Sequence, residues 1–272
     1  LINKMKYEFF ILDLWPYILI ACIFLFCHLY KPKNSNKICF FTLLIFSIFR
    51  YDVGWDYTSY VSVIESGYDN IVDSRYEFFS KYIFLIGSYL SFYPIVFAIF
   101  SFLTLRIFYI SVSRYSINPL LSWLVFYSMP LFFFASLTTI RQSLAMLIVF
   151  YSYRLALEKK YVYFLITIIV SILFHPSAIV GLLILPIMIF PVGKLINIIL
   201  FICSFYVGSM IISFINNSDL FLLSRLKMYI GFEEPKPQLL NYLYYAFGIF
   251  NLLFYDKLVK INPKNKAIIT LI

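Results

Sequence analysis

The feature that most constrains this chain is a succession of nine apolar runs separated by polar connections. The runs lie at about residues 14–30, 36–49, 93–112, 119–135, 138–156, 161–174, 177–190, 195–215 and 241–255. A helix needs about 20 apolar residues to cross a bilayer, and every backbone polar group must be paired inside the hydrocarbon core. Continuous runs without alternation therefore predict an all-α transmembrane helical bundle with about nine to ten spans, several of them short.

Composition excludes a soluble globular domain. Hydrophobic residues make up 62% of the 272 residues and charged residues only 13%, whereas soluble domains carry about 25% charged residues. We therefore expect one transmembrane domain over residues 1–272. The net charge is +9, but Lys and Arg fall in the connections, which is typical of membrane orientation, so no nucleic-acid partner is expected. The four cysteines lack the spacing of a disulfide framework or zinc site, and neither a metal nor a cofactor is expected.

The orientation of the chain depends on residues 76–92, where two charged residues interrupt an aromatic stretch. If this segment does not cross the membrane, 13 of the 22 Lys and Arg residues face the cytoplasm, and the positive-inside rule favours that topology. It predicts short or re-entrant segments near 76–92 and 174–177. Most acidic residues then lie outside the cytoplasm, which suits a face that handles polar ligands. The extracytoplasmic loops in this topology are residues 50–77 and 216–240.

The first polar motif, Arg-Tyr-Asp-Val-Gly-Trp-Asp-Tyr, directly follows the second apolar run. In a binding site, Arg50 would bind an anion, and the carboxylate of Asp52 or Asp56 would contact sugar hydroxyls or act as a base. Trp55 and Tyr57 would stack on sugar faces. A solvated loop with one salt bridge is the alternative, and Trp and Tyr also anchor helices at membrane interfaces.

A second polar turn lies in the fifth run, where Arg141 is followed by Gln142. An arginine at the centre of a lone transmembrane helix costs about 2.5–3.5 kcal/mol, so Arg141 is expected near the interface or in a polar cavity. Its planar guanidinium and the positive end of the helix suit a phosphate, with Gln142 as a further substrate-binding residue. Glu77, flanked by aromatics, is expected inside the same cavity. A structural arginine that reaches the interface is the alternative.

His175 stands before Pro176, which cannot continue a hydrogen-bonded helix, so a helix break or a helix start is expected there. With an ordinary pKa near 6.5, a histidine can accept or relay a proton. His175 is therefore a candidate catalytic residue, and a histidine at a capped turn is the structural alternative.

Three stretches together resemble a known family. They are Arg50–Tyr57 followed by Tyr60, the Arg-Gln-x-x-Ala pattern within Ile140–Ala145, and the Phe-His-x-Ser-Ala pattern within Leu173–Ala178. In order and spacing they resemble the EpsG family of polysaccharide-biosynthesis membrane proteins, which is related in role to Wzy-type O-antigen and capsule polymerases. The resemblance covers nearly the whole chain.

The resemblance implies a multi-pass protein of the bacterial inner (cytoplasmic) membrane that polymerises capsule, exopolysaccharide or O-antigen. On the extracytoplasmic face it would transfer oligosaccharide units from undecaprenyl pyrophosphate to an acceptor glycan, as a metal-independent glycosyltransferase. Arg50 and Arg141 would then stabilise charge on the leaving pyrophosphate. The base would be His175 or Asp56, with Asp52 a further catalytic candidate. The expected partners are the undecaprenyl-pyrophosphate-linked oligosaccharide, membrane lipid and other polysaccharide-assembly proteins.

Two other functions stay open at this stage. A transporter or flippase for lipid-linked oligosaccharides would also need arginines for pyrophosphate, but it predicts cations at several depths along a path. A membrane O-acyltransferase that uses His175 predicts a cytoplasmic entrance for the acyl donor, which the favoured topology contradicts. The chain stops within the apolar run 267–272, which is compatible with a longer parent protein.

Overall fold

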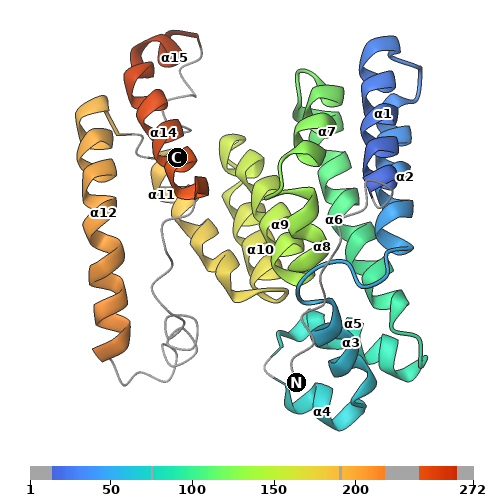
Figure 1. Cartoon of the computed structure of the whole chain (residues 1–272). Helices are drawn as coiled ribbons and strands as arrows, with labels where there is room; N and C mark the ends of the chain where they lie inside the picture. The colour runs from blue at the N-terminus through green and yellow to red at the C-terminus, as the bar shows by residue number, and fades with distance from the viewer. Residues whose placement is uncertain (1–13, 75, 190–191, 218–238, 262–272) are drawn as a thin grey trace, which may run out of the picture. The chain divides into compact units, whose positions relative to one another are not determined.

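The computed structural model of this chain describes residues 14–74, 76–189, 192–217 and 239–261. Every regular element within these ranges is a helix, so the all-α prediction is confirmed (Figure 1). The chain divides into two compact units, Leu1–Leu182 and Leu183–Ile272, and each is described by itself. The predicted loop at 216–240 lies almost wholly outside the described residues.

The first unit contains ten α-helices and a 3-10 helix among its described residues. They are α1 (Trp15–Tyr30), α2 (Ser35–Ile48), α3 (Tyr57–Glu65), α4 (Tyr68–Asp73), α5 (Phe78–Tyr89), α6 (Pro94–Tyr115), α7 (Pro119–Ser128), α8 (Phe133–Thr138), α9 (Ile140–Leu157), α10 (Tyr161–Ile172) and η2 (Pro176–Leu183). A proline stands in the first turn of α1, α6 and α7, where its missing N–H costs no helical hydrogen bond.

Several apolar runs give shorter helices than their lengths predict. The run at 119–135 is divided between α7 and α8, with Pro130 in the turn between them. A proline cannot donate the hydrogen bond that would continue α7, which explains the break. The ambiguous segment 76–92 forms α5, which has 12 residues. Its length of about 18 Å is well short of a hydrocarbon core of about 30 Å, so this segment is short as predicted, and re-entry stays a prediction.

One helix of the described ranges, α6, is long and apolar enough to cross a bilayer by itself. Shorter apolar helices accompany it, at Trp15–Tyr30, Ser35–Ile48, Pro119–Ser128, Tyr161–Ile172, Pro176–Ile189 and Lys194–Ser204. The count of nine to ten spans therefore stays a prediction.

The buried residues form two hydrophobic clusters, and both clusters contain residues of α6. In the first cluster α1, α2, α7 and α8 pack around Trp123, and the rings of Phe108 and Phe126 stack with centroids 4.0 Å apart. In the second cluster α3, α5 and α9 pack around Phe97 and Phe100 of the same helix. Figure 1 shows α3, α4 and α5 gathered at one end of this bundle. The second cluster supports the candidate site.

The second unit has four described helices, α11 (Ile184–Ile189), α12 (Lys194–Asn217), α14 (Leu239–Leu253) and α15 (Tyr255–Ile261). Helices α12 and α14 pack closely, because Gly248 leaves room for the ring of Phe201. An ion pair of 2.8 Å between Lys194 and Asp256 ties the start of α12 to α15.

Candidate functional site

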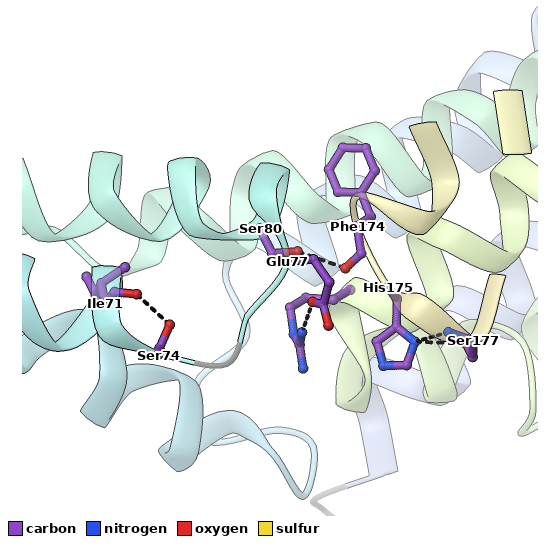
Figure 2. A network of polar contacts seen from close by, with 8 residues as sticks. Ile71, Ser74, Glu77, Ser80, Phe174, His175 and Ser177 are labelled. Carbon is purple, nitrogen blue, oxygen red and sulfur yellow. Dashed lines mark hydrogen bonds and ion pairs between the residues drawn. The ribbon is translucent and has the colours of Figure 1, made fainter. Parts of the chain in front are cut away.

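Three segments that are distant in the sequence meet at the end of the bundle near α5. The hydroxyl of Ser80 donates to the carbonyl of Phe174 at 3.0 Å, which ties α5 to the turn after α10 (Figure 2). The amide of Phe79 donates to the carbonyl of Leu173 at 3.1 Å. The hydroxyl of Ser171 donates to the carbonyl of Ala145 at 2.7 Å, so α10 is fixed to α9 as well. These bonds place the first turns of α5 and α9 beside the His175 turn.

Arg141 and Glu77 form an ion pair across this junction, in which Nη1 of Arg141 donates to Oε2 of Glu77. The two side chains are only 13% and 15% exposed. The guanidinium also lies 4.3 Å from the ring centroid of Tyr76, a geometry in which an aromatic face attracts a cation. Both charged residues were predicted for the site from sequence, and the structure brings them together.

Arg50 follows α2 and is 8% exposed. Its three guanidinium nitrogens are buried, and none has a hydrogen-bond partner among the described residues. The face of the Phe97 ring, 4.8 Å from the guanidinium carbon, stabilises the charge only in part. Burial lowers the pKa of Arg50 to about 10, so the side chain remains a cation at neutral pH. A buried cation without a carboxylate is costly by itself, and an anionic ligand would relieve that cost.

Tyr60, on α3, connects the two arginines. The Arg141 guanidinium carbon lies 5.9 Å from the centroid of the Tyr60 ring. The Tyr60 ring lies 6.5 Å from the ring of Phe97, which faces Arg50. Tyr60 has no role among the predicted site residues. Its spacing of three residues from Tyr57, which puts both rings on one face of α3, is the sequence signal that points to it. We call Arg50, Tyr60, Glu77 and Arg141 the arginine cluster.

The loop that carries Arg50 is held against α8 by close backbone packing. Asp52 has φ of +50° and Gly54 has φ of +106°, so the segment is not helical and the two aspartates do not share a helical face. A Cβ atom on Gly54 would lie 2.6 Å from the carbonyl oxygen of Leu137, at the end of α8. Only glycine allows this approach together with a positive φ. The loop is thereby fixed next to the start of α9, where Arg141 lies.

The other residues of this loop differ in how deeply they are buried. Tyr57 is buried, and its ring stacks on Phe97 with centroids 4.7 Å apart, so it contributes to the core beneath the arginine cluster. Trp55 is 94% exposed. Asp52 is exposed and Asp56 half-buried, and neither forms an ion pair with another described residue. The loop that begins at Arg50 thus carries an exposed aromatic ring and two carboxylates that form no ion pair with a described residue.

His175 stands in the turn between α10 and η2, as the proline after it predicts. Its Nδ1 lies 2.8 Å from the hydroxyl oxygen of Ser177 and 3.3 Å from the Ser177 amide nitrogen. Burial, and then the positive charge of Arg141, lower the pKa of His175 to about 4. The imidazole is therefore neutral at pH 7 and lies within electrostatic reach of the arginine cluster.

Gln142 is separated from the cluster. It lines a mostly apolar groove of about 930 Å³ between α6, α7, α8 and α9, together with Thr139 and Ser143. Successive residues of a helix are rotated by about 100°, so Gln142 faces away from Arg141 although it follows it directly. The structure therefore does not bring the predicted substrate-binding residue Gln142 to the same place as the arginines.

The protein-family model for the EpsG family matches residues 36–272, which include the loop of Arg50, the Arg141 turn and the His175 turn. The chain belongs to the EpsG family. This EpsG-family protein is thereby associated with polysaccharide biosynthesis at a membrane. Among curated proteins and among solved structures, none matches the chain.

Proposed function

We propose that this EpsG-family protein is a polysaccharide polymerase of the bacterial inner membrane. It transfers oligosaccharide units from undecaprenyl pyrophosphate to an acceptor glycan on the extracytoplasmic face, in capsule, exopolysaccharide or O-antigen assembly. The observation that carries the proposal is the buried guanidinium of Arg50, which has no hydrogen-bond partner among the described residues. It faces the ring of Phe97, and the neighbouring ring of Tyr60 faces the guanidinium of Arg141. Two converging cations suit a ligand with two adjacent phosphates.

The two arginines have different tasks in this proposal. Arg50 has no competing carboxylate in the described structure, so it is free to take up a phosphate directly. Arg141 already pairs with Glu77, which orients its guanidinium while leaving further donors of the fork for a second phosphate. Because a guanidinium remains charged at every physiological pH, the cluster keeps a positive potential where negative charge develops.

In the reaction, the bond between the anomeric carbon and the phosphate oxygen breaks, and both electrons stay on the departing pyrophosphate. The oxygen of an acceptor hydroxyl forms the new bond to the anomeric carbon and loses its proton. Donors that are already oriented toward the phosphate oxygens stabilise the charge that grows on the leaving group, without reorganisation during the step. This is the role of Arg50 and Arg141.

The proton of the acceptor hydroxyl passes to a carboxylate of the loop. Asp56 is the first choice because it stands immediately before α3, the helix that carries Tyr60, and Asp52 is the alternative in the same loop. Trp55, almost fully exposed, offers a face on which a sugar ring can stack. Nδ1 of His175 already bonds with the hydroxyl and the amide of Ser177, which leaves the loop carboxylates for this task.

Polymer length tests the proposal in a strain whose surface glycan depends on this protein. We expect Arg50→Ala to abolish the ladder of polymer lengths while single repeat units still reach the outer leaflet. Arg50→Lys should retain part of the activity, because it keeps the charge but loses the planar fork. Arg154→Ala is the matched control, since that arginine pairs with Glu158 on the exposed end of α9.

Two results would contradict the proposed function. Repeat units that accumulate inside the cell in Arg50→Ala would indicate a transporter of lipid-linked oligosaccharides. A normal ladder in Arg50→Ala, with equal amounts of protein in the membrane, would remove the anion site from the mechanism altogether.

A further inference from the structure

The hydrogen bonds around His175 determine which ring nitrogen carries the proton. The Ser177 amide is 3.3 Å from Nδ1 and is only a donor, so Nδ1 must present its lone pair. The Ser177 hydroxyl, 2.8 Å from the same atom, then donates to it as well. A neutral imidazole has one N–H and one lone pair, so the hydrogen must be on Nε2.

The backbone of the turn keeps this arrangement in place. The amide of His175 donates to the carbonyl of Ser171 at 3.0 Å, which fixes the residue to the end of α10. Pro176 restricts the next φ angle, and the amide of Ala178 donates to the carbonyl of His175 at 3.2 Å. This tight turn brings the amide of Ser177 back to the ring two residues before it, as in side-chain turns of the Asx type.

The opposite edge of the ring is available to a ligand. No described residue forms a hydrogen bond with Nε2, and Figure 2 shows the Ser177-bonded edge of the imidazole turned away from Glu77. The charged groups that face the ring are Arg141, from α9, and its partner Glu77, at the start of α5. Burial, and then the charge of Arg141, lower the pKa of the imidazole, so the ring is held neutral beside the arginine cluster.

We infer that Ser177 is a positioning residue that holds His175 as the neutral Nε2–H tautomer, so that His175 donates a hydrogen bond to an oxygen of the bound ligand. The identity of that oxygen, on the diphosphate or on the sugar next to it, rests on the proposed function. The assignment of the tautomer does not rest on the proposed function, because it follows from the hydrogen bonds of Ser177 alone. In this arrangement His175 supplies a third hydrogen-bond donor in addition to Arg50 and Arg141. The proton of the acceptor hydroxyl passes to a loop carboxylate instead of to His175.

The chain has two histidines, which makes a direct measurement practical. In the full chain with His28→Gln, labelled with ¹⁵N-histidine and placed in lipid nanodiscs, every imidazole signal comes from His175. At pH 7 we expect a protonated Nε2 and an unprotonated Nδ1 whose signal shows a hydrogen bond. In Ser177→Ala the Nδ1 signal should move toward that of a free lone pair, and the Nδ1–H tautomer should increase roughly fivefold, because one neutral hydrogen bond is lost. Ser177→Thr should restore both, and Ser66→Ala is the control.

A protonated Nδ1 in the parent protein would overturn the inference, as would identical spectra for the parent protein and Ser177→Ala. Polymer assays then test the donor role. We expect His175→Gln, which can donate but cannot act as a base near neutral pH, to retain more polymerisation than His175→Ala, and Ser177→Thr more than Ser177→Ala. Equal loss in His175→Gln and His175→Ala would overturn the donor role.

The histidine spectra test the inference, and the polymer assay of Arg50→Ala tests the proposed function, so the two can fail separately. If the spectra show Nε2–H and its dependence on Ser177, while Arg50→Ala polymerises normally, the tautomer stands and the polymerase proposal fails. If the spectra show Nδ1–H while Arg50→Ala abolishes the ladder, the inference fails and the polymerase proposal stands.

Discussion

Arg141 and Glu77 form an ion pair that joins the first turn of α9 to the residue before α5. The pair connects two segments that are 64 residues apart, and both side chains are mostly shielded from water. It is thus both a tertiary contact and the structural support for the Arg141 guanidinium. The two roles can be separated by experiment.

Glu77→Gln is expected to destabilise the protein by about 2 kcal/mol, because it leaves a largely buried arginine without its counter-ion. Removing one partner of a fully buried ion pair costs about 3–5 kcal/mol, and the partial exposure of Arg141 reduces that cost. Thermal unfolding of the purified protein in detergent measures the change. Glu158→Gln is the matched control: Glu158 pairs with Arg154 and Lys160 at the exposed end of α9, and its loss should leave Tm nearly unchanged. Equal shifts of Tm for the two variants would contradict the structural role of the Glu77 pair.

Gly54→Ala is expected to impair both stability and polymerisation, because the new Cβ would collide with the carbonyl oxygen of Leu137 and displace the loop that carries Arg50. Gly67→Ala is a close control: its φ is also positive, at +92°, but no atom lies within 4 Å of the added Cβ. Gly67→Ala should therefore show only the backbone strain, on the order of 1 kcal/mol. If Tm and polymer length respond alike in both variants, close packing of the loop on α8 is not what places Arg50.

The apolar runs predict the positions of the long helices. They do not predict α3 and α4, which lie within the segment 50–77 that the sequence presents as a loop, and they do not show which charged residues pair. The run 161–174 corresponds to α10 and the run 138–156 to α9, because continuous apolar sequence strongly favours a helix in this class of protein. The pairing of Arg141 with Glu77 depends on how α5 meets α9, which no local pattern encodes. Gln142 is adjacent to Arg141 in the sequence but separated from the arginine cluster in the structure. Successive residues of a helix point in directions about 100° apart, so the two side chains face different sides of α9.

Acidification should destabilise the protein through His175. Its pKa is lowered from about 6.5 in the unfolded chain to about 4 in the fold, so the unfolded state binds more protons between these pH values. The contribution of His175 to stability is therefore complete above about pH 6.5 and is lost as pH falls toward 4. Tm measured at pH 7 and pH 5 should fall less in His175→Gln than in the parent protein. An equal fall in both would show that other groups cause the acid sensitivity.

Inorganic pyrophosphate should raise the Tm of the purified protein, because an anion that binds the folded state beside Arg50 stabilises it by mass action, by about 2.7 kcal/mol at a concentration 100 times Kd. Arg50→Ala should abolish the concentration-dependent rise, whereas Arg154→Ala should retain it. Sulfate at matched ionic strength controls for general salt effects, which act equally on all three proteins. A rise that persists unchanged in Arg50→Ala would place anion binding elsewhere on the protein. Because this measurement needs no glycan, it tests the buried cation of Arg50 as an anion site independently of any polymerase assay.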